Sequence, residues 1–393
     1  MSSLRPGQQY CYRVGDADRM NNSNNTSPWS DWKQFTTVPD DDQSPVYFAA
    51  IADSGTYGNV SNVMKSLSSD PDITMVVHGG DLSYGLKDQV WELFGNIVEP
   101  VTSIKPFMVI PGNWDVKPDA IGSFLNRYKM PLAYPNPTTT LTNGSITSTN
   151  FNMFYALPYN TAYMIMLSSY DPLDKDSVQY SWLLDQLVYV NDRRDVYPWL
   201  VIFLHSPMYT SSQGHGGSDL KMRELLEPLL TEYLVNVVVS GHDHGYERTY
   251  PVQGGQVLNE ERNNYVKFDG TIHVLAGTGG ADLDPWMDYP SWTAHRESSV
   301  GYTKFKATYD RLDVTYLRVD GSTGDSFVLH RNSGQFRHHL RTKSDDELPL
   351  LLEFLILVSV VLPVAACLRI CCPKRQVISN DHYYKMRMRS SLV

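Results

Sequence analysis

The sequence predicts an α/β fold: a layered β-sandwich flanked by helices. From residue 46 to residue 276, short apolar runs alternate with longer stretches whose apolar residues recur at helical spacing. This is the pattern of strands and helices packed in layers. The 393-residue chain is long enough for two or three domains and a large core. No cysteine lies between residues 12 and 366, so this core must be stable without a disulfide.

The start of the chain predicts two β-strands. A Pro-Gly turn precedes an alternating run that places Tyr10, Tyr12 and Val14 on one face, and a second strand is expected over residues 29–37. Two strands do not make a stable sandwich by themselves. Residues 1–38 resemble the last two strands of a fibronectin type III-like domain. We therefore expect a fragment that lacks the earlier strands of this domain and any signal peptide.

A polar linker, residues 38–45, leads into the central region, where apolar runs predict strands and amphipathic stretches predict helices. The expected strands are residues 46–52, 73–78, 106–110, 163–168, 199–204, 234–239 and 271–276, and the expected helices are residues 59–67, 89–104, 177–191 and 222–233. A further β region is expected to continue to about residue 330, with strands over residues 302–308 and 311–318.

Potential metal ligands follow five of these strands. They are Asp53, Asp81, Asn113, His205, and the pair His242 and His244. A single Asp after a strand is most often a helix cap or a turn residue, but five such strand ends indicate a shared site. If the sheet is open and mostly parallel, their side chains converge on one edge. This number of carboxylate, amide and imidazole ligands suits two metal ions, which can clamp a displacement at phosphorus.

The charge of the chain argues against nucleic-acid binding as its main function. The formal net charge is −10, from 33 Lys and Arg against 43 Asp and Glu, and there is no long basic tract. An acidic protein that handles anionic phosphates needs a local positive centre, which bound metal ions supply.

Five short blocks resemble, in order and spacing, those of the purple acid phosphatases, a branch of the calcineurin-like metallophosphoesterases. The blocks are Asp53-Ser54-Gly55, Gly80-Asp81-Leu82-Ser83-Tyr84, Gly112-Asn113, Leu204-His205-Ser206-Pro207 and Gly241-His242-Asp243-His244. The resemblance covers residues 4 to about 332. It implies the metallophosphoesterase fold, with a catalytic domain over residues 46–332 that includes the C-terminal purple acid phosphatase region.

The resemblance also implies a dinuclear centre of Fe(III) and a divalent ion, which is Fe, Zn or Mn. The implied ligands are Asp53, Tyr84 and His244 for the ferric ion, Asn113, His205 and His242 for the divalent ion, and Asp81 as the bridge between them. The phenolate of Tyr84 suits Fe(III), and its charge transfer gives the family its purple colour.

Trp114 and His215 stand at positions where the family has histidines that face the substrate. Where the family usually has a histidine that contacts phosphate, this chain has Trp114, whose indole cannot donate a proton to a leaving group near neutral pH. His215 lies in a glycine-rich loop and matches one of two substrate-facing histidines of plant members, while Gly214 replaces the other. His215 could bind phosphate, donate a proton, or be a solvated loop residue. His78 is expected to be structural.

We therefore expect a dinuclear metal-dependent acid phosphatase that hydrolyses phosphate monoesters by attack of metal-bound hydroxide. The expected catalytic residues are Asp81, Asn113 and His215, and the expected partner is a phosphate ester. Two alternatives stay open: a phosphodiesterase or nucleotide pyrophosphatase of the same superfamily, and an inactive cell-surface binding protein on this fold. Tyr84 favours the phosphatase, and Trp114 is the support for the inactive protein.

Residues 348–368 predict a transmembrane helix, because about 20 mostly apolar residues span a bilayer. A buried core helix is the alternative. Lys and Arg dominate residues 369–393, and this positive-inside bias places the tail in the cytosol and the α/β domain outside the cell or in a lumen. We expect a single-pass type I membrane protein of the cell surface or of endo-lysosomes.

Several short motifs fit such a topology. Sequons for N-glycosylation occur at Asn21, Asn24, Asn25, Asn59 and Asn143. Cys367, Cys371 and Cys372 could carry palmitate, whereas Cys11 is either a free thiol or paired with a residue upstream. Residues 383–386, Tyr-Tyr-Lys-Met, fit an endosomal sorting signal.

Overall fold

The structure is a computed structural model, and it describes residues 4–15, 29–131, 140–142, 145–147, 153–266 and 269–331. The chain divides into two units, residues 1–336 and 337–393, of which the second lies wholly outside the described residues. The expected membrane helix, cytosolic tail, palmitoylation sites and sorting signal therefore lie outside them, as do all the sequons except that at Asn59. Within the described ranges, no helix combines the length and apolar character needed to cross a membrane.

The first of two seven-stranded sheets holds the first three strands of the central region. In spatial order it consists of β15 (Asn264–Tyr265), β20 (Thr323–His330), β19 (Arg311–Arg318), β18 (Gly301–Ala307), β3 (Val46–Ile51), β4 (Met75–His78) and β5 (Phe107–Val109). Strands β3, β4 and β5 are parallel to one another, whereas β18 runs antiparallel to β3.

The second sheet is built around four parallel strands. Its spatial order is β17 (Thr293–Glu297), β12 (Tyr246–Thr249), β16 (Ile272–Ala276), β11 (Val237–Ser240), β10 (Trp199–Phe203), β9 (Ala162–Met166) and β8 (Tyr155–Tyr159). Strands β9, β10, β11 and β16 are parallel, and the strands at both edges are antiparallel to their neighbours.

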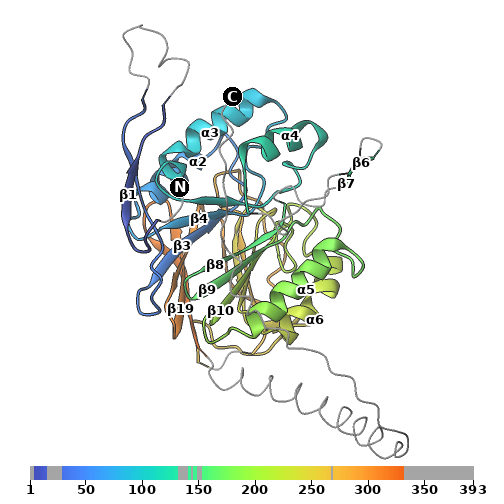
Figure 1. The fold of residues 1–393 in the computed structure, drawn as a ribbon. Coiled ribbons are helices and arrows are strands. Elements are labelled where there is room, and N and C mark those ends of the chain that lie inside the picture. Colours follow the sequence, from blue (N-terminus) through green and yellow to red (C-terminus); the bar gives the residue numbers. More distant parts are fainter. Residues whose placement is uncertain are drawn as a thin grey trace, which may run out of the picture. The chain divides into compact units, whose positions relative to one another are not determined.

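Helices cover the outer faces of both sheets. Figure 1 shows α2 (Val60–Ser69), α3 (Asp88–Thr102) and α4 (Pro118–Arg127) grouped on one side, and α5 (Val178–Asn191) and α6 (Leu220–Glu232) on the other. Side-chain caps fix where the last two helices begin: Ser177 accepts the backbone N–H of Tyr180, and Asp219 accepts that of Met222.

The alternation of side chains along β3 explains the layers. Phe48 and Ala50 point between the sheets, where Phe48 stacks on Phe305 with ring centroids 4.5 Å apart. Ala49 and Ile51 point to the opposite face and pack with the helices. Burial of each such large apolar side chain contributes about 1.5–3 kcal/mol, so the core is stable without disulfides.

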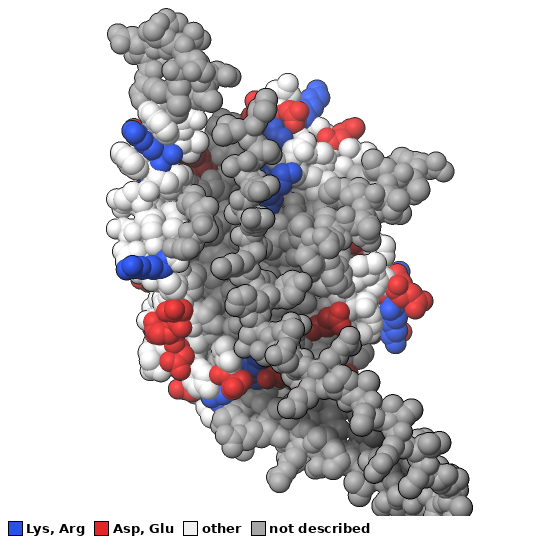
Figure 2. Space-filling model, in the orientation of Figure 1, with Lys and Arg blue, Asp and Glu red and all other residues white. Residues whose placement is uncertain are grey.

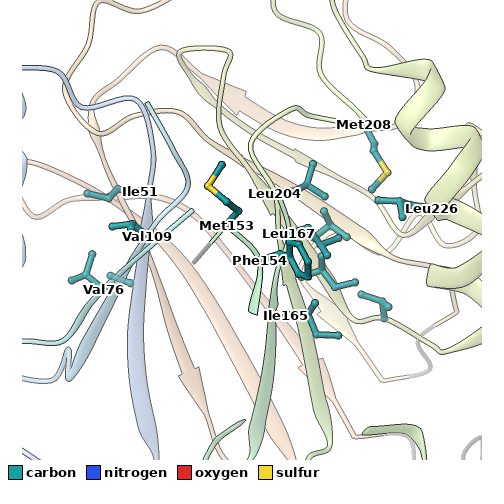
Figure 3. Close-up of a cluster of buried hydrophobic side chains, with 14 of the residues drawn as sticks. Ile51, Val76, Val109, Met153, Phe154, Ile165, Leu167, Leu204, Met208 and Leu226 are labelled. Atoms are coloured by element: carbon teal, nitrogen blue, oxygen red, sulfur yellow. The ribbon is translucent and has the colours of Figure 1, made fainter. Parts of the chain in front are cut away.

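The buried clusters on the outer faces of the two sheets flank the strand ends. Figure 3 shows Ile51, Val76 and Val109 of the first sheet on one side, and on the other side Ile165 of β9 together with residues that flank strands of the second sheet or lie in α6. The labelled side chains are Ile51, Val76, Val109, Met153, Phe154, Ile165, Leu167, Leu204, Met208 and Leu226. This packing fixes the strands whose ends carry the predicted ligands.

Most elements predicted for the central region are confirmed, with small shifts of their bounds. The strand expected over residues 234–239 begins only at Val237, because Leu234 adopts a left-handed conformation (φ 52°) at the end of α6. The sequence analysis did not single out α4, β8 and β12.

The N-terminal strands form a short antiparallel hairpin of β1 (Gln9–Tyr12) and β2 (Lys33–Thr36). Both strands are shorter than expected, and Val14 lies beyond β1 with 64% of its surface exposed. The Tyr12 hydroxyl donates to the Ser103 carbonyl at 2.7 Å, which ties the hairpin to the end of α3. The fibronectin-like origin of this hairpin stays a prediction. The remaining short strands pair as β6 (Thr140–Thr142) with β7 (Ser145–Thr147), and β13 (Val252–Gln253) with β14 (Gln256–Val257).

Candidate metal centre

The strand ends that the sequence singled out meet at one place, but they come from two sheets. Asp53, Asp81 and Asn113 follow β3, β4 and β5 of the first sheet, while His205 and His242 follow β10 and β11 of the second. A single open sheet would have gathered all of them on its own edge. Instead, the parallel strands of both sheets end on the same side of the sandwich and bring their loops together.

One half of the site is built around Asp53. The Tyr84 hydroxyl lies 3.1 Å from Asp53 Oδ1 and 2.8 Å from His244 Nε2. The other oxygen of Asp53 accepts the backbone N–H of His242 at 2.8 Å. Asp53, Tyr84 and His244, the three ligands expected for the ferric ion, are therefore neighbours.

The other half is built around Asn113. Its Oδ1 lies 3.2 Å from His205 Nε2 and 3.0 Å from His242 Nδ1. Asp81 Oδ1 lies 3.7 Å from His205 Nε2, and Asp53, Asp81 and His205 bring one potential ligand atom each within 4.8 Å of one another. Asp81 thus lies between the two halves, at the position expected of a bridging ligand.

The polar side chains of the site present more hydrogen-bond acceptors than N–H and O–H donors. His205 Nδ1 lies 2.8 Å from the Gly79 carbonyl, and His244 Nδ1 lies 2.7 Å from the Asp282 carbonyl. Because a carbonyl oxygen only accepts, each Nδ1 carries a proton, and with one proton on the ring each Nε2 presents a lone pair. The lone pair of His205 faces the Asn113 oxygen, and that of His244 faces the Tyr84 hydroxyl, whose single proton is shared between His244 and Asp53. Such convergence of nitrogen and oxygen acceptors, each imidazole oriented by a carbonyl, fits the binding of metal ions.

Burial sets the charges of these groups. It raises the pKa of Asp81 to about 6 and, together with the nearby charge of Asp81, raises the pKa of Asp53 well above its usual range. Burial also lowers the pKa of His205 and His242 to about 3, so both imidazoles are neutral near pH 7. Buried carboxylates beside neutral imidazoles are the electrostatic setting that a bound cation stabilises.

Backbone strain is concentrated in the same loops. Six non-glycine residues in the described part of the chain have φ values in the left-handed region, and four of them belong to this site. They are Asp53 (φ 60°), Asp81 (φ 56°), Tyr84 (φ 55°) and His242 (φ 75°). Such conformations cost about 1–3 kcal/mol each and persist where the surrounding structure enforces them, as at functional sites.

Asp115 is a buried residue whose role the sequence analysis missed. Its Oδ2 accepts the backbone N–H groups of Asp81 and Gly112, each at 2.8 Å, and its Oδ1 accepts that of Leu82 at 3.2 Å. It therefore joins the loops after β4 and β5. Gly112 is required in this joint, because a Cβ there would lie 2.1 Å from Asp81 Oδ1. An aspartate two residues after Asn113 in a turn was the available signal.

The structure places His215 beside the predicted ligands. Its ring stacks on His242 with centroids 4.1 Å apart, and its Nδ1 lies 3.0 Å from Asp243 Oδ1. Asp243 is fully buried, and burial raises its pKa. Asp284 lies in the same cluster and accepts the backbone N–H of His244 at 2.7 Å. Neither Asp243 nor Asp284 was expected from the sequence to have a role here.

Trp114 follows Asn113 and lies against Tyr84. The two rings meet edge to face with centroids 5.6 Å apart, and the backbone N–H of Trp114 donates to Asp81 Oδ1 at 2.8 Å. The Lys117 ammonium lies 2.8 Å from the centroid of the indole ring. One face of the indole is therefore already covered by a cation.

Two further residues complete the surroundings. Tyr170, which the sequence analysis did not single out, places its hydroxyl 3.4 Å from Asn113 Oδ1 and is half-buried. His78 is fully buried and lies 2.8 Å from the Ser54 hydroxyl, and burial lowers its pKa to about 3. Its ring packs against Phe94 and Phe107, which agrees with the structural role expected for it.

The charged surface agrees with the absence of a basic tract in the sequence. On the face drawn in Figure 2, the described Lys and Arg side chains form small separate groups among Asp and Glu side chains.

Two family models match the chain. The model described as calcineurin-like phosphoesterase matches residues 46–246, and the model described as iron/zinc purple acid phosphatase-like protein C matches residues 270–326. All five blocks that carry the predicted ligands lie within the first match.

Individual proteins are similar over most of this chain but over only part of their own length. Purple acid phosphatase 18 of Arabidopsis thaliana is 32% identical over 304 residues, 74% of this chain and 60% of that protein. Phosphoenolpyruvate phosphatase of Allium cepa is 28% identical, over 77% of this chain and 62% of that protein. The solved structure of purple acid phosphatase PPD1 from yellow lupin (Lupinus luteus) is 25% identical with a TM-score of 0.73, over 85% of this chain and 61% of that one.

Proposed function

Since this chain belongs to the calcineurin-like phosphoesterase family and, within it, to the purple acid phosphatases, we propose that it hydrolyses phosphate monoesters at a dinuclear metal centre. The observation that carries the proposal is the convergence of seven potential ligands at the ends of strands from both sheets. They are Asp53, Asp81, Tyr84, Asn113, His205, His242 and His244.

The ligands divide between the ions according to their contacts. Asp53, Tyr84 and His244 are neighbours and would hold Fe(III), for which a phenolate oxygen is a suitable hard ligand. Asn113, His205 and His242 would hold the divalent ion, which is Fe, Zn or Mn. Asp81 would bridge the two ions. When bound, such a pair of ions lowers the pKa of water and stabilises negative charge on phosphate oxygens.

The residues around this centre would orient the substrate and supply hydrogen bonds. His215 is fixed by its stacking on His242 and by Asp243, so its Nε2 is the nitrogen left to meet the substrate. In the imidazolium form of the ring, this Nε2 would donate to a phosphate oxygen or to a leaving group. Tyr170 would donate a further hydrogen bond beside Asn113. Trp114 carries only an indole N–H, which hydrogen-bonds but does not transfer a proton near neutral pH.

Phosphate esters with good leaving groups are the favoured substrates in this proposal. Loss of a general acid costs most when the leaving group needs a proton, so Trp114 penalises alkyl phosphates more than aryl or anhydride phosphates. The Allium cepa relative is named a phosphoenolpyruvate phosphatase. An enol is a better leaving group than an alkyl alcohol, so the name is consistent with this preference.

The full-length chain, purified and analysed for metals, tests the proposal. We expect about two metal ions per chain, one of them iron, and hydrolysis of 4-nitrophenyl phosphate. Asp81→Asn removes the bridging negative charge and should abolish both metal loading and activity. A fully active Asp81→Asn protein would place the active site elsewhere, and absence of any hydrolysis with two ions bound would favour the inactive binding protein.

The location of the protein is a second part of the proposal, and it rests on the sequence alone. Residues 348–368 would anchor the chain in a membrane with residues 369–393 in the cytosol. Antibody against an epitope in the tail should therefore label permeabilised cells only. Labelling of the tail in intact cells would show that this orientation is wrong.

A further inference from the structure

Lys117 packs on Trp114, the residue that follows the expected ligand Asn113. Its ammonium is 2.8 Å from the centroid of the Trp114 ring, and that ring makes an edge-to-face contact with Tyr84 at a centroid distance of 5.6 Å. The backbone N–H of Trp114 donates to Asp81 Oδ1 at 2.8 Å, which fixes the main chain of Trp114 beside the expected bridging ligand. Lys117 and Trp114 are both half-buried, so they face the solvent side of the site.

The charge of Lys117 is not neutralised by the protein. Within the described ranges, no carboxylate oxygen lies within ion-pair distance of its ammonium. Some other basic side chains of this domain are already paired: Arg248 pairs with Asp325 at 2.6 Å and Arg318 with Glu297 at 2.7 Å. Arg296 donates to the Ser211 hydroxyl at 2.6 Å and to backbone carbonyls. Lys117 is thus a cation available to a ligand.

The position of this cation restricts what it can bind. The interior of the site is lined by carboxylates, among them Asp53 and Asp81, to which two metal ions have been assigned above. A protonated ammonium has no lone pair to offer a metal ion and carries a positive charge itself, so Lys117 is not a metal ligand. A cation at the rim of a phosphate site attracts a negative group that extends from the scissile phosphate outwards. The Trp114 ring holds the ammonium in place by a cation–π interaction, so less side-chain entropy is lost on binding.

We propose that Lys117, positioned by Trp114, binds a second anionic group of the substrate. The substrate class is a phosphate ester or anhydride whose leaving group carries its own carboxylate or phosphate a few atoms from the scissile phosphorus. This inference rests on the proposed phosphatase function and names the substrate class for it. It also assigns a role to Trp114, because the ring holds the Lys117 ammonium against one of its faces.

Matched substrates test the proposal in the full-length enzyme. Phenyl phosphate is compared with 3-carboxyphenyl phosphate and with benzene-1,3-diyl bisphosphate, so that the two anionic groups are tested separately. The variants are Lys117→Met, which removes the charge, Lys117→Arg, which keeps it, and Lys65→Met as a control on the exposed face of α2. A charge-assisted hydrogen bond at a partly exposed site predicts a rise of about 3- to 10-fold in KM for the anionic substrates in Lys117→Met.

The expected pattern is selective. Phenyl phosphate should keep its KM in Lys117→Met, and Lys117→Arg and Lys65→Met should behave as wild type with all three substrates. If Lys117→Met changes all three substrates equally, Lys117 supports the site as a whole and the subsite proposal is wrong. A loss confined to the carboxylate or to the bisphosphate identifies which group Lys117 binds.

A binding measurement tests the anion subsite at Lys117 independently of whether the protein is an active phosphatase. Phenylphosphonate and 3-carboxyphenylphosphonate, which are not hydrolysed, are titrated calorimetrically into the wild type and Lys117→Met. Tighter binding of the carboxylated compound that disappears in Lys117→Met supports the subsite even if no phosphatase activity is found. Equal affinities of the two compounds for the wild type would overturn the subsite even in an active phosphatase.

Discussion

His215 Nδ1 lies 3.0 Å from Asp243 Oδ1, and the His215 ring stacks on His242 at 4.1 Å between centroids. Asp243 stands in the chain between His242 and His244, two of the expected ligands. The same short turn therefore supplies two imidazoles to the metal centre and a fully buried carboxylate that orients a third imidazole. With Nδ1 engaged, Nε2 is the atom of His215 that a substrate meets.

The first prediction concerns this pair. If His215 donates the proton to the leaving group, His215→Ala should lower kcat on alkyl phosphates by about 10²–10⁴-fold and spare activated aryl phosphates. Asp243→Asn weakens the orienting hydrogen bond and should cost less, about 10-fold. His295→Ala, which alters a half-buried histidine paired with Glu297, is the control. Equal turnover of alkyl and aryl esters in wild type and His215→Ala would show that water or the substrate supplies the proton.

The second prediction concerns Tyr84. With iron bound, the protein should show a charge-transfer band in the visible spectrum, and Tyr84→Phe should abolish it because the phenolate oxygen is lost. Tyr57→Phe is a matched control, since its ring lies 6.1 Å from that of Tyr84 but it is not an expected ligand. Absorption spectra and metal analysis of the three proteins provide the readout. A colourless wild type with two zinc ions and no iron would contradict the ferric assignment while leaving a metallophosphoesterase.

The third prediction concerns Trp114. Trp114→His introduces a side chain that can transfer a proton beside Asp81, so it should raise kcat/KM on alkyl phosphates more than on aryl phosphates. Steady-state kinetics with one alkyl and one aryl ester would measure the ratio. Trp114→Phe, which keeps an aromatic ring without a proton to transfer, is the control and should leave the ratio unchanged. An unchanged ratio in Trp114→His would mean that this position does not act on the leaving group.

The fourth prediction concerns the stability of the catalytic domain. Arg248 and Asp325 form a buried ion pair, with Arg248 Nε donating at 2.6 Å and Tyr246 donating to the same carboxylate at 2.9 Å. Asp325→Asn leaves the guanidinium uncompensated and should lower the free energy of unfolding by about 3–5 kcal/mol. Urea unfolding at neutral pH measures this loss. Asp313→Asn, which removes the half-buried partner of the exposed Arg311, should cost less than about 1 kcal/mol.

The pH dependence of this stabilisation follows from the pKa of Asp325. Burial alone would raise this pKa, but the hydrogen bonds and charge of Arg248 hold it below its usual value. A carboxyl group whose pKa is lowered by folding stabilises the protein above the pKa of the unfolded chain, about 3.9, and loses this contribution as the pH falls further. The difference between wild type and Asp325→Asn should therefore be constant from pH 7 to pH 5 and shrink below pH 4. A difference that disappears already at pH 5 would contradict this assignment.

The local features of this protein could be predicted from its sequence. Valine-rich runs such as residues 237–239 form strands because their buried side chains fit a sheet covered on both faces, and Ser177 and Asp219 mark helix starts because they cap backbone N–H groups. The ligand types were equally visible, because each expected ligand directly follows an apolar run or lies in the turn after it. Such patterns depend on neighbours in the chain, which a sequence displays.

The tertiary structure decided which of these features act together. The ligands come from two facing sheets rather than one edge, and no local pattern shows how the two sheets align. Contacts made only by folding also decide what other residues do. Asp115 accepts a backbone N–H from the loop after β4, Asp243 orients His215, and Lys117 packs on the ring of Trp114. The pKa values of the site residues also depend on tertiary structure. Burial raises the pKa of Asp81 to about 6, and burial depends on the packing of the whole domain. The sequence thus determined which groups were available, and the packing of the two sheets determined their distances and charges.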